Sequence, residues 1–186
     1  MTINIIHDDR RPEKMPLLLE ELSKQGITNY KIWPPVEDSN SVIRSINLSH
    51  KQIIQDAKDR GLDEVCVAED DVFFTAPNAY QRFLDKKPVF FNLYLGGCYT
   101  PIKHGWDEAP YSYTLNPVGL HFYICHSRYY ETFLSTDENM HIDTAQSSIG
   151  IKVCYPMVAL QRPGFSANNR GHADYNSILK PEDIYQ

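Results

Sequence analysis

The segment VCVAEDDVFF, residues 65–74, places three consecutive carboxylates inside an apolar run that is typical of a buried strand. An unpaired carboxylate in such a place costs several kcal/mol, so each acid needs a partner, water or a cation. On an extended backbone Glu69 and Asp71 project to one side and Asp70 to the other. Hard divalent cations take oxygen ligands, and Mg²⁺ is often held by one or two carboxylates together with substrate phosphates. The pattern therefore predicts a clamp for a metal ion and a nucleotide at a strand end.

The same triplet fits two plainer interpretations. It can form a solvated turn after the strand, or an acidic cap for a following helix. As a pattern alone, the triplet leaves these interpretations and the metal site open. Its surroundings favour the metal site, because a helix that contains Ser49-His50 and ends before Gly61 immediately precedes the acidic strand.

Strands and helices alternate along the chain. Besides the acidic strand, we expect strands at 2–6, 30–33, 89–95 and 119–125, and helices at 12–25, from Asn47 or Ser49 as the cap to 60, at 80–85 and at 127–134. This alternation indicates an α/β sheet covered by helices. Two long loops rich in Pro and Gly, at 98–117 and 161–175, are candidates for binding surfaces.

The composition is that of one globular domain. A chain of 186 residues is long enough for one core of ordinary size, and we predict a single domain over residues 1–186. Hydrophobic residues make up 42% and aromatic residues 12%, which excludes a disordered chain. The net charge of -6 argues against nonspecific binding to nucleic acid, which depends on Lys and Arg.

Cysteine usage and hydropathy indicate the compartment. The four cysteines lie far apart without a CxxC pair, which predicts buried, reduced thiols rather than a zinc site. The first residues lack the pattern of a signal peptide, and no stretch approaches the roughly 20 apolar residues that span a bilayer. We therefore expect a soluble, cytoplasmic protein, with a peripheral position at the inner membrane left open.

Several short motifs follow one another along nearly the whole chain. They are Asp9-Arg10-Arg11, Leu48-Ser49-His50, Glu69-Asp70-Asp71-Val72, the segments 91–97 and 119–124, His141-Ile142-Asp143, and then Pro156, Gln161 and Ser166. No single motif is specific, but their common order resembles glycosyltransferase family 25, the lipooligosaccharide-type and collagen-type galactosyltransferases.

The resemblance implies a GT-A-like α/β fold, in which a mostly parallel central sheet flanked by helices binds a nucleotide sugar. It implies a metal-dependent hexosyltransferase that uses Mn²⁺ or Mg²⁺ and inverts the configuration at the transferred sugar. The donor would be a UDP-hexose. The acceptor would be a glycan of the lipooligosaccharide type, as in lipopolysaccharide biosynthesis, or another hydroxyl compound.

The resemblance also implies roles for individual residues. Glu69 and Asp71 would hold the metal, with His172, or else Asp174, as a further ligand. An inverting transfer needs a base at the acceptor hydroxyl, and Asp143 is the candidate, although Asp143 fits a helix cap equally well. Asp70 would serve the sugar or the scaffold. The expected nucleotide-binding residues are Arg10, Arg11, Ser49, His50, Glu69, Gly96 and Gly97.

Some of these assignments have alternatives. Arg10 and Arg11 can bind a diphosphate or can simply be solvated turn residues. The chain is short for the family, and Asn92 stands where many relatives carry Asp, so a catalytically silent nucleotide-sugar-binding module is a second hypothesis. A metal-dependent phosphoryl-transfer enzyme or nuclease is a third. The negative net charge and the single acidic cluster disfavour it.

Overall fold

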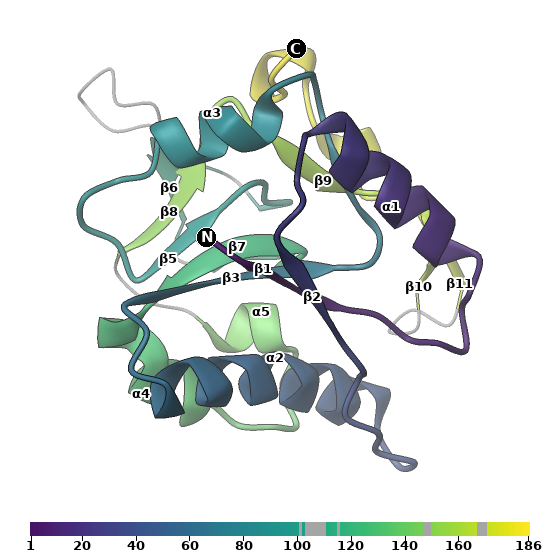
Figure 1. Ribbon diagram of the computed structural model, residues 1–186, viewed down its shortest axis with the longest axis vertical. Coiled ribbons are helices and arrows are strands. Elements are labelled where there is room, and N and C mark those ends of the chain that lie inside the picture. Colours follow the sequence, from purple (N-terminus) through teal and green to yellow (C-terminus); the bar gives the residue numbers. More distant parts are fainter. Residues whose placement is uncertain (101, 103–110, 115, 147–149, 167–170) are drawn as a thin grey trace.

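The computed structural model describes residues 1–100, 102, 111–114, 116–146, 150–166 and 171–186. Within that part of the chain a seven-stranded sheet lies between two layers of helices (Figure 1). Its strands are β1 (Ile3–Ile6), β2 (Tyr30–Trp33), β3 (Glu64–Glu69), β5 (Leu93–Leu95), β6 (Tyr111–Tyr113), β7 (Phe122–His126) and β8 (Ile151–Cys154). Their order is β2-β1-β3-β7-β5-β8-β6, and only β7 and β6 run against the other described strands of this sheet.

Helices cover both faces of the sheet. The helices α1 (Lys14–Lys24) and α3 (Ala79–Asp85) lie on one face, and α2 (Val42–Asp59), α4 (Tyr130–Leu134) and α5 (Ile142–Ala145) lie on the other (Figure 1). Along β3, Val65 and Val67 belong to one apolar core, whereas Cys66 and Ala68 belong to the other. The strand is therefore buried on both faces. This explains its unbroken apolar run, because a strand with one wet face would alternate.

Phe83 of α3 offers a test of how the core is packed. Its fully buried ring stacks on Tyr94 of β5 with 4.4 Å between the ring centroids. Replacing Phe83 with Ala is expected to lower the free energy of unfolding by about 3–5 kcal/mol, because it leaves a cavity. Chemical denaturation measures this. The control is Phe90→Ala, a 68% exposed ring whose contact with the Arg128 guanidinium, 4.3 Å from the ring centroid, limits the expected loss to about 1 kcal/mol. Equal losses for both variants would contradict the packing.

The predicted start of the second helix is wrong. The helix α2 begins at Val42, and its cap is Ser41, whose side chain accepts a hydrogen bond from the backbone N–H of Arg44 at 3.1 Å. Asn47 and Ser49 lie inside the helix instead. Short polar side chains can bond to nearby backbone within a helix as well as at its start, so residue type alone does not place the cap.

The predicted strand at 89–95 is too long. The strand β5 begins at Leu93, and the preceding Val89 and Phe90 are 98% and 68% exposed. The proline at position 88 lacks the N–H that a sheet ladder needs, which helps to keep the chain irregular before β5. The predicted helix at 127–134 is a short 3-10 turn, Ser127–Tyr129, followed by α4.

Two small antiparallel sheets, missing from the sequence prediction, complete the described structure. The strand β4 (Val72–Phe74) pairs with β9 (Ala159–Gln161), and β10 (Gly164–Ser166) pairs with β11 (Gly171–Ala173). Strands of three residues carry too little periodicity to be seen in a sequence. Short 3-10 turns at Asn176–Ile178 and Pro181–Asp183 follow β11. The β4–β9 pairing brings the late segment against the acidic turn.

All four cysteines are buried and free, as predicted, and burial raises the pKa of the Cys66 and Cys125 thiols, so both stay neutral. Among the described residues, no helix has both the length and the apolar character needed to cross a bilayer.

Candidate functional site

The acidic triplet lies where β3 ends and turns into β4. Glu69 is the last residue of β3, beside Ile6, the last residue of β1, so the carboxyl ends of two parallel strands meet there. The strand ends at Glu69, and the rule of alternating sides therefore does not extend to Asp70 and Asp71. Both of these carboxylates contact the same ammonium group, which corrects the expectation that Asp70 points away from Asp71.

Both carboxylate oxygens of Glu69 have donors. His50 of α2 donates from Nε2 to Oε1 at 3.2 Å, and Gln161 of β9 donates from Nε2 to Oε2 at 3.0 Å. The other imidazole nitrogen, Nδ1, lies 3.0 Å from the hydroxyl of Tyr123 and accepts from it when His50 is neutral. Burial by itself raises the pKa of Glu69, but the hydrogen bond from His50, together with the charges of His50, His121 and Lys14, outweighs burial and holds that pKa below its usual value. Glu69 is thus an oriented carboxylate.

Asp70 is held on both oxygens as well. His7, the residue after β1, places Nδ1 2.9 Å from Oδ2, and Lys14 of α1 places Nζ 2.6 Å from Oδ1. The residue is only 8% exposed. These contacts tie the turn to β1 and α1, and they fit the scaffold role that the sequence left open for Asp70.

Asp71 differs from its two neighbours. Lys14 Nζ lies 3.2 Å from Oδ2, whereas Oδ1 is buried and has no hydrogen-bond partner among the described residues. Burial, reinforced by the charge of Glu69, raises the pKa of Asp71 to about 6. A buried carboxylate oxygen without a donor is costly, and a bound cation would compensate it.

The residues present fit a divalent cation that is bound partly by its substrate. Within the described part of the chain, no group of three His, Cys, Asp or Glu side chains is arranged to hold a metal ion by itself. The Oδ1 atom of Asp71, which lacks a partner in the part of the chain that the structure describes, is one available hard ligand. Mg²⁺ commonly takes one or two carboxylates and completes its shell with phosphate oxygens and water, so this donor suits a cation that arrives with a diphosphate.

The predicted third ligand lies on the hairpin β10–β11. His172 pairs with Phe165 across this hairpin, and in the described residues it makes no hydrogen bond or ion pair with the triplet. Arg11 reaches the same hairpin, because its Nη1 donates to the carbonyl of Phe165 at 3.1 Å and its guanidinium lies 5.0 Å from the ring centroid. His172 therefore stands beside a segment that the Arg11 turn contacts, and its role as a ligand stays a prediction.

The two arginines of the turn have different surroundings. Arg10 donates from Nε to Asp8 Oδ1 at 2.8 Å and from Nη2 to Asp8 Oδ2 at 2.9 Å, and its side chain is 68% exposed. This matches the solvated-turn interpretation. Arg11, with only a carbonyl and an aromatic ring as partners among the described residues, keeps donors available for a phosphate.

Asp143 lies in the first turn of α5. Its Oδ1 accepts from the backbone N–H of Thr144 at 2.7 Å, and its Oδ2 accepts from that of Gly119 at 3.0 Å. The side chain thus supports the helix start and also fastens the segment that leads into β7. It is half-buried, and its role as a base stays a prediction.

Three of the expected nucleotide-binding residues are packed into the core. Ser49 accepts from the backbone N–H of Val36 at 2.8 Å and donates to the carbonyl of Ser45 at 2.7 Å. A Cβ added at Gly97 would lie 2.1 Å from the carbonyl oxygen of Ala159, and one at Gly96 would lie 2.6 Å from a ring atom of Phe122. Close backbone packing therefore accounts for these two glycines, and nucleotide contacts are not needed to explain them.

Several residues that hold the site were missed in the sequence. Lys14 and His7 contact the triplet, and Lys14 could have been suspected because it lies in the first turn of the predicted helix 12–25, beside the charged turn. Tyr99 and Asn176 hold the backbone of Gln161. The Tyr99 hydroxyl accepts from the N–H of Gln161 at 2.7 Å, and Asn176 Nδ2 donates to its carbonyl at 2.9 Å. No local pattern links these residues.

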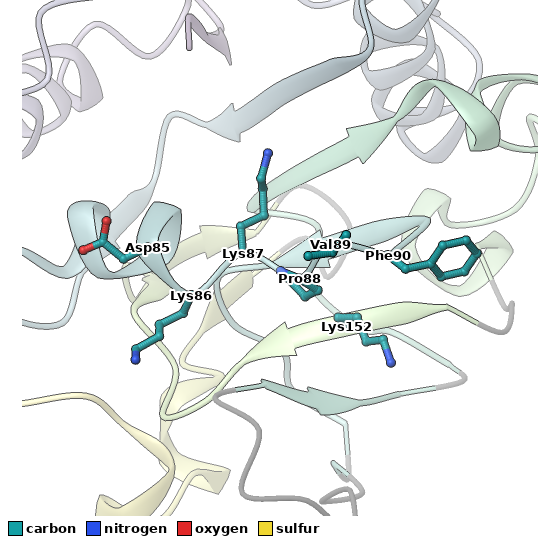
Figure 2. A pocket seen from close by; sticks show the side chains of 7 residues that line it. All are labelled: Asp85, Lys86, Lys87, Pro88, Val89, Phe90 and Lys152. Atoms are coloured by element: carbon teal, nitrogen blue, oxygen red, sulfur yellow. The ribbon is translucent and has the colours of Figure 1, made fainter.

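A separate hollow of about 530 Å³ lies at the amino ends of β5 and β8. Its lining consists of Asp85, Lys86, Lys87, Pro88, Val89, Phe90 and Lys152. Figure 2 shows that the three lysine side chains point away from one another, and Lys87 forms an ion pair with Glu64. The acidic triplet follows the carboxyl end of β3, and β3 runs parallel to β5 and β8. The hollow lies at the amino ends of β5 and β8, so it is on the opposite side of the sheet from the triplet.

Solved structures resemble this protein in fold. "A197 from STIV" matches with a TM-score of 0.53 and 16% identity, over 100% of this chain and 96% of that one. The fold is therefore shared. A glycosyltransferase involved in the glycosylation of the major capsid of PBCV-1 matches with a TM-score of 0.42 and 18% identity, over 70% of this chain and 62% of that one. The catalytic domain of Drosophila β1,4-galactosyltransferase 7 matches with a TM-score of 0.42 and 15% identity, over 76% of this chain and 54% of that one.

This chain thus spans less than two thirds of each of those two glycosyltransferase chains. No protein-family model matches the sequence, and no curated protein sequence matches it either. The predicted α/β architecture is confirmed, with a mostly parallel sheet between helices. At 16% identity the likeness to A197 concerns the fold alone.

Proposed function

We propose that residues 1–186 form one glycosyltransferase domain that transfers hexose from a UDP-linked donor to a glycan hydroxyl, with inversion and with a divalent cation. The observation that carries the proposal is the buried Oδ1 of Asp71, which has no hydrogen-bond partner among the described residues and lies in an acidic turn. This turn follows a strand of a mostly parallel sheet, at the edge where such sheets bind ligands. The ordered motifs that resemble family 25 support the same proposal.

The chain's own residues divide the work of donor binding. Asp71 would hold the cation with Oδ1, and Glu69, oriented by His50 and Gln161, would accept hydrogen bonds from the nucleotide. Arg11 would contact the diphosphate. A bound Mn²⁺ or Mg²⁺ supplies Lewis-acid stabilisation of the negative charge that develops on the leaving diphosphate.

The acceptor needs a base on the other side of the sugar. In a transfer with inversion, the acceptor hydroxyl loses its proton as it attacks, and a carboxylate within hydrogen-bond reach takes that proton. We assign this role to Asp143, whose carboxylate is half-buried and held in one orientation by two backbone N–H groups. Asp70, with both oxygens already bonded, would support the turn.

Calorimetric titration of the full chain with UDP and Mn²⁺ tests the proposal. We expect an affinity in the micromolar range, which is common for enzyme substrates. Removing the cation with a chelator is expected to weaken UDP binding by about tenfold, equal to about 1.4 kcal/mol. Absence of any binding heat with UDP and Mn²⁺ would contradict the proposal. UDP binding without sugar turnover across a panel of glycan acceptors would instead support a catalytically silent binding module.

A further inference from the structure

Lys14 occupies an unusual position for a lysine. It is the first residue of α1, and its Nζ lies between two carboxylates, 2.6 Å from Asp70 Oδ1 and 3.2 Å from Asp71 Oδ2. Its side chain is 21% exposed, so most of the side chain is withdrawn from solvent. The first turn of a helix carries a partial positive charge, which makes this end unfavourable for a cation. Only the two carboxylates compensate the ammonium among the described residues.

The two carboxylates depend on Lys14 to different degrees. Asp70 has a second partner, because His7 Nδ1 lies 2.9 Å from its other oxygen. Asp71 has the longer contact with Lys14 and no other hydrogen-bond partner for its side chain among the described residues. Burial lowers the pKa of Lys14, but the charges of Asp71 and Asp70 and their hydrogen bonds to Lys14 together outweigh burial and raise that pKa, so the side chain remains a cation.

We propose that Lys14 is a built-in counter-ion of Asp71, that it competes with the divalent cation for this carboxylate, and that once displaced it contacts the donor diphosphate. The inference rests on the proposed function, since the cation and the diphosphate come from it. Two positive charges cannot share one buried carboxylate at contact distance without repulsion. Lys14 would keep Asp71 compensated while the site is empty, and an ammonium group on a four-carbon stem can swing to a nearby phosphate.

One substitution is therefore expected to move two affinities in opposite directions. Lys14→Met removes the charge and keeps the length of the side chain. Without nucleotide, Mn²⁺ is expected to bind Lys14→Met about tenfold more tightly than the wild type, equal to about 1.4 kcal/mol. In saturating Mn²⁺, UDP is expected to bind the same variant about tenfold more weakly. Electron paramagnetic resonance of free Mn²⁺ measures the first affinity, and calorimetry measures the second.

The controls separate charge from shape and fold. Lys24→Met changes an exposed lysine in the last turn of the same helix, where it pairs with Glu20, and should leave both affinities unchanged. Lys14→Arg keeps the charge and should show no gain in Mn²⁺ affinity. Asp71→Asn combined with Lys14→Met should lose the gain. If Lys14→Met does not fold, Lys14→Gln, whose amide can still donate to Asp70, carries the same two expectations.

The proposal is overturned if Lys14→Met binds Mn²⁺ no more tightly than the wild type, if Lys14→Arg shows the same gain, or if UDP affinity does not fall. It is also overturned if neither protein binds Mn²⁺. The Mn²⁺ titration contains no nucleotide, so it reports on Lys14 even if the wild type fails to bind UDP. Failure of the proposed function and failure of this inference are therefore distinguishable.

Discussion

Replacing Asp71 with Asn is expected to lower kcat/KM for a UDP-hexose donor by on the order of a hundredfold, the usual cost of losing one group that stabilises charge in a transition state. Asn keeps the shape of the side chain but removes the negative charge that would hold the cation. The measurement is Mn²⁺-dependent release of UDP from the donor, with and without glycan acceptors. The control is Asp85→Asn, an exposed carboxylate in the hollow at the opposite edge of the sheet, which should change the rate little.

Asp71→Asn should not lower the free energy of unfolding. The pKa of Asp71 is raised to about 6 in the folded protein, above the usual value of 3.8, so the fold disfavours its ionised form. The folded state then binds this proton more tightly than the unfolded state. This tighter proton binding stabilises the folded state below pH 3.8, and the stabilisation is lost as the pH rises through about 6. At pH 7 a neutral Asn should therefore leave the free energy of unfolding equal to that of the wild type or higher. Lost activity with lost stability would contradict the assignment.

Replacing Gly97 with Ala is expected to lower the free energy of unfolding by about 3 kcal/mol or more, because the new Cβ cannot be packed without moving the backbone. That Cβ would lie 2.1 Å from the carbonyl oxygen of Ala159, a backbone atom of β9. Thermal or chemical denaturation measures the loss. Gly26→Ala is the matched control, since its Cβ meets open space and only the left-handed φ of +65° opposes it, which costs about 1–2 kcal/mol. A smaller loss at Gly97 than at Gly26 would rule out the tight contact.

The close packing of Gly96 and Gly97 against β9 also helps to position the site. Gly96 accepts hydrogen bonds at its carbonyl from the backbone N–H groups of Val158 and Ala159, at 2.8 and 3.1 Å. These contacts set β9 beside the end of β5, and β9 in turn carries Gln161 to Glu69. The glycines that the sequence suggested for nucleotide binding thus contribute by positioning a neighbouring strand.

Residues 65–74 by themselves indicated a buried strand and three acids near its end that need compensation. The structure adds that β3 is buried on both faces and that the acids lie in a turn rather than on a continuing strand. The sequence also predicted that the first two long helices end just before Gly26 and Gly61. Both glycines adopt a left-handed φ, +65° at Gly26 and +64° at Gly61. Such features depend on backbone preference and on burial along one segment, so they are written locally in the sequence.

Only the tertiary structure decided which partner each carboxylate has. Lys14, His50 and Gln161 come from three separate elements, α1, α2 and β9, and they reach the triplet through sheet order and the β4–β9 pairing. No periodicity marks such side chains, because a single hydrogen bond or ion pair has no repeat along the chain. The sequence by itself determined that the three acids need compensation. The packing of distant elements decided that each carboxylate oxygen of Glu69 and Asp70 has a partner, whereas Oδ1 of Asp71 has none among the described residues.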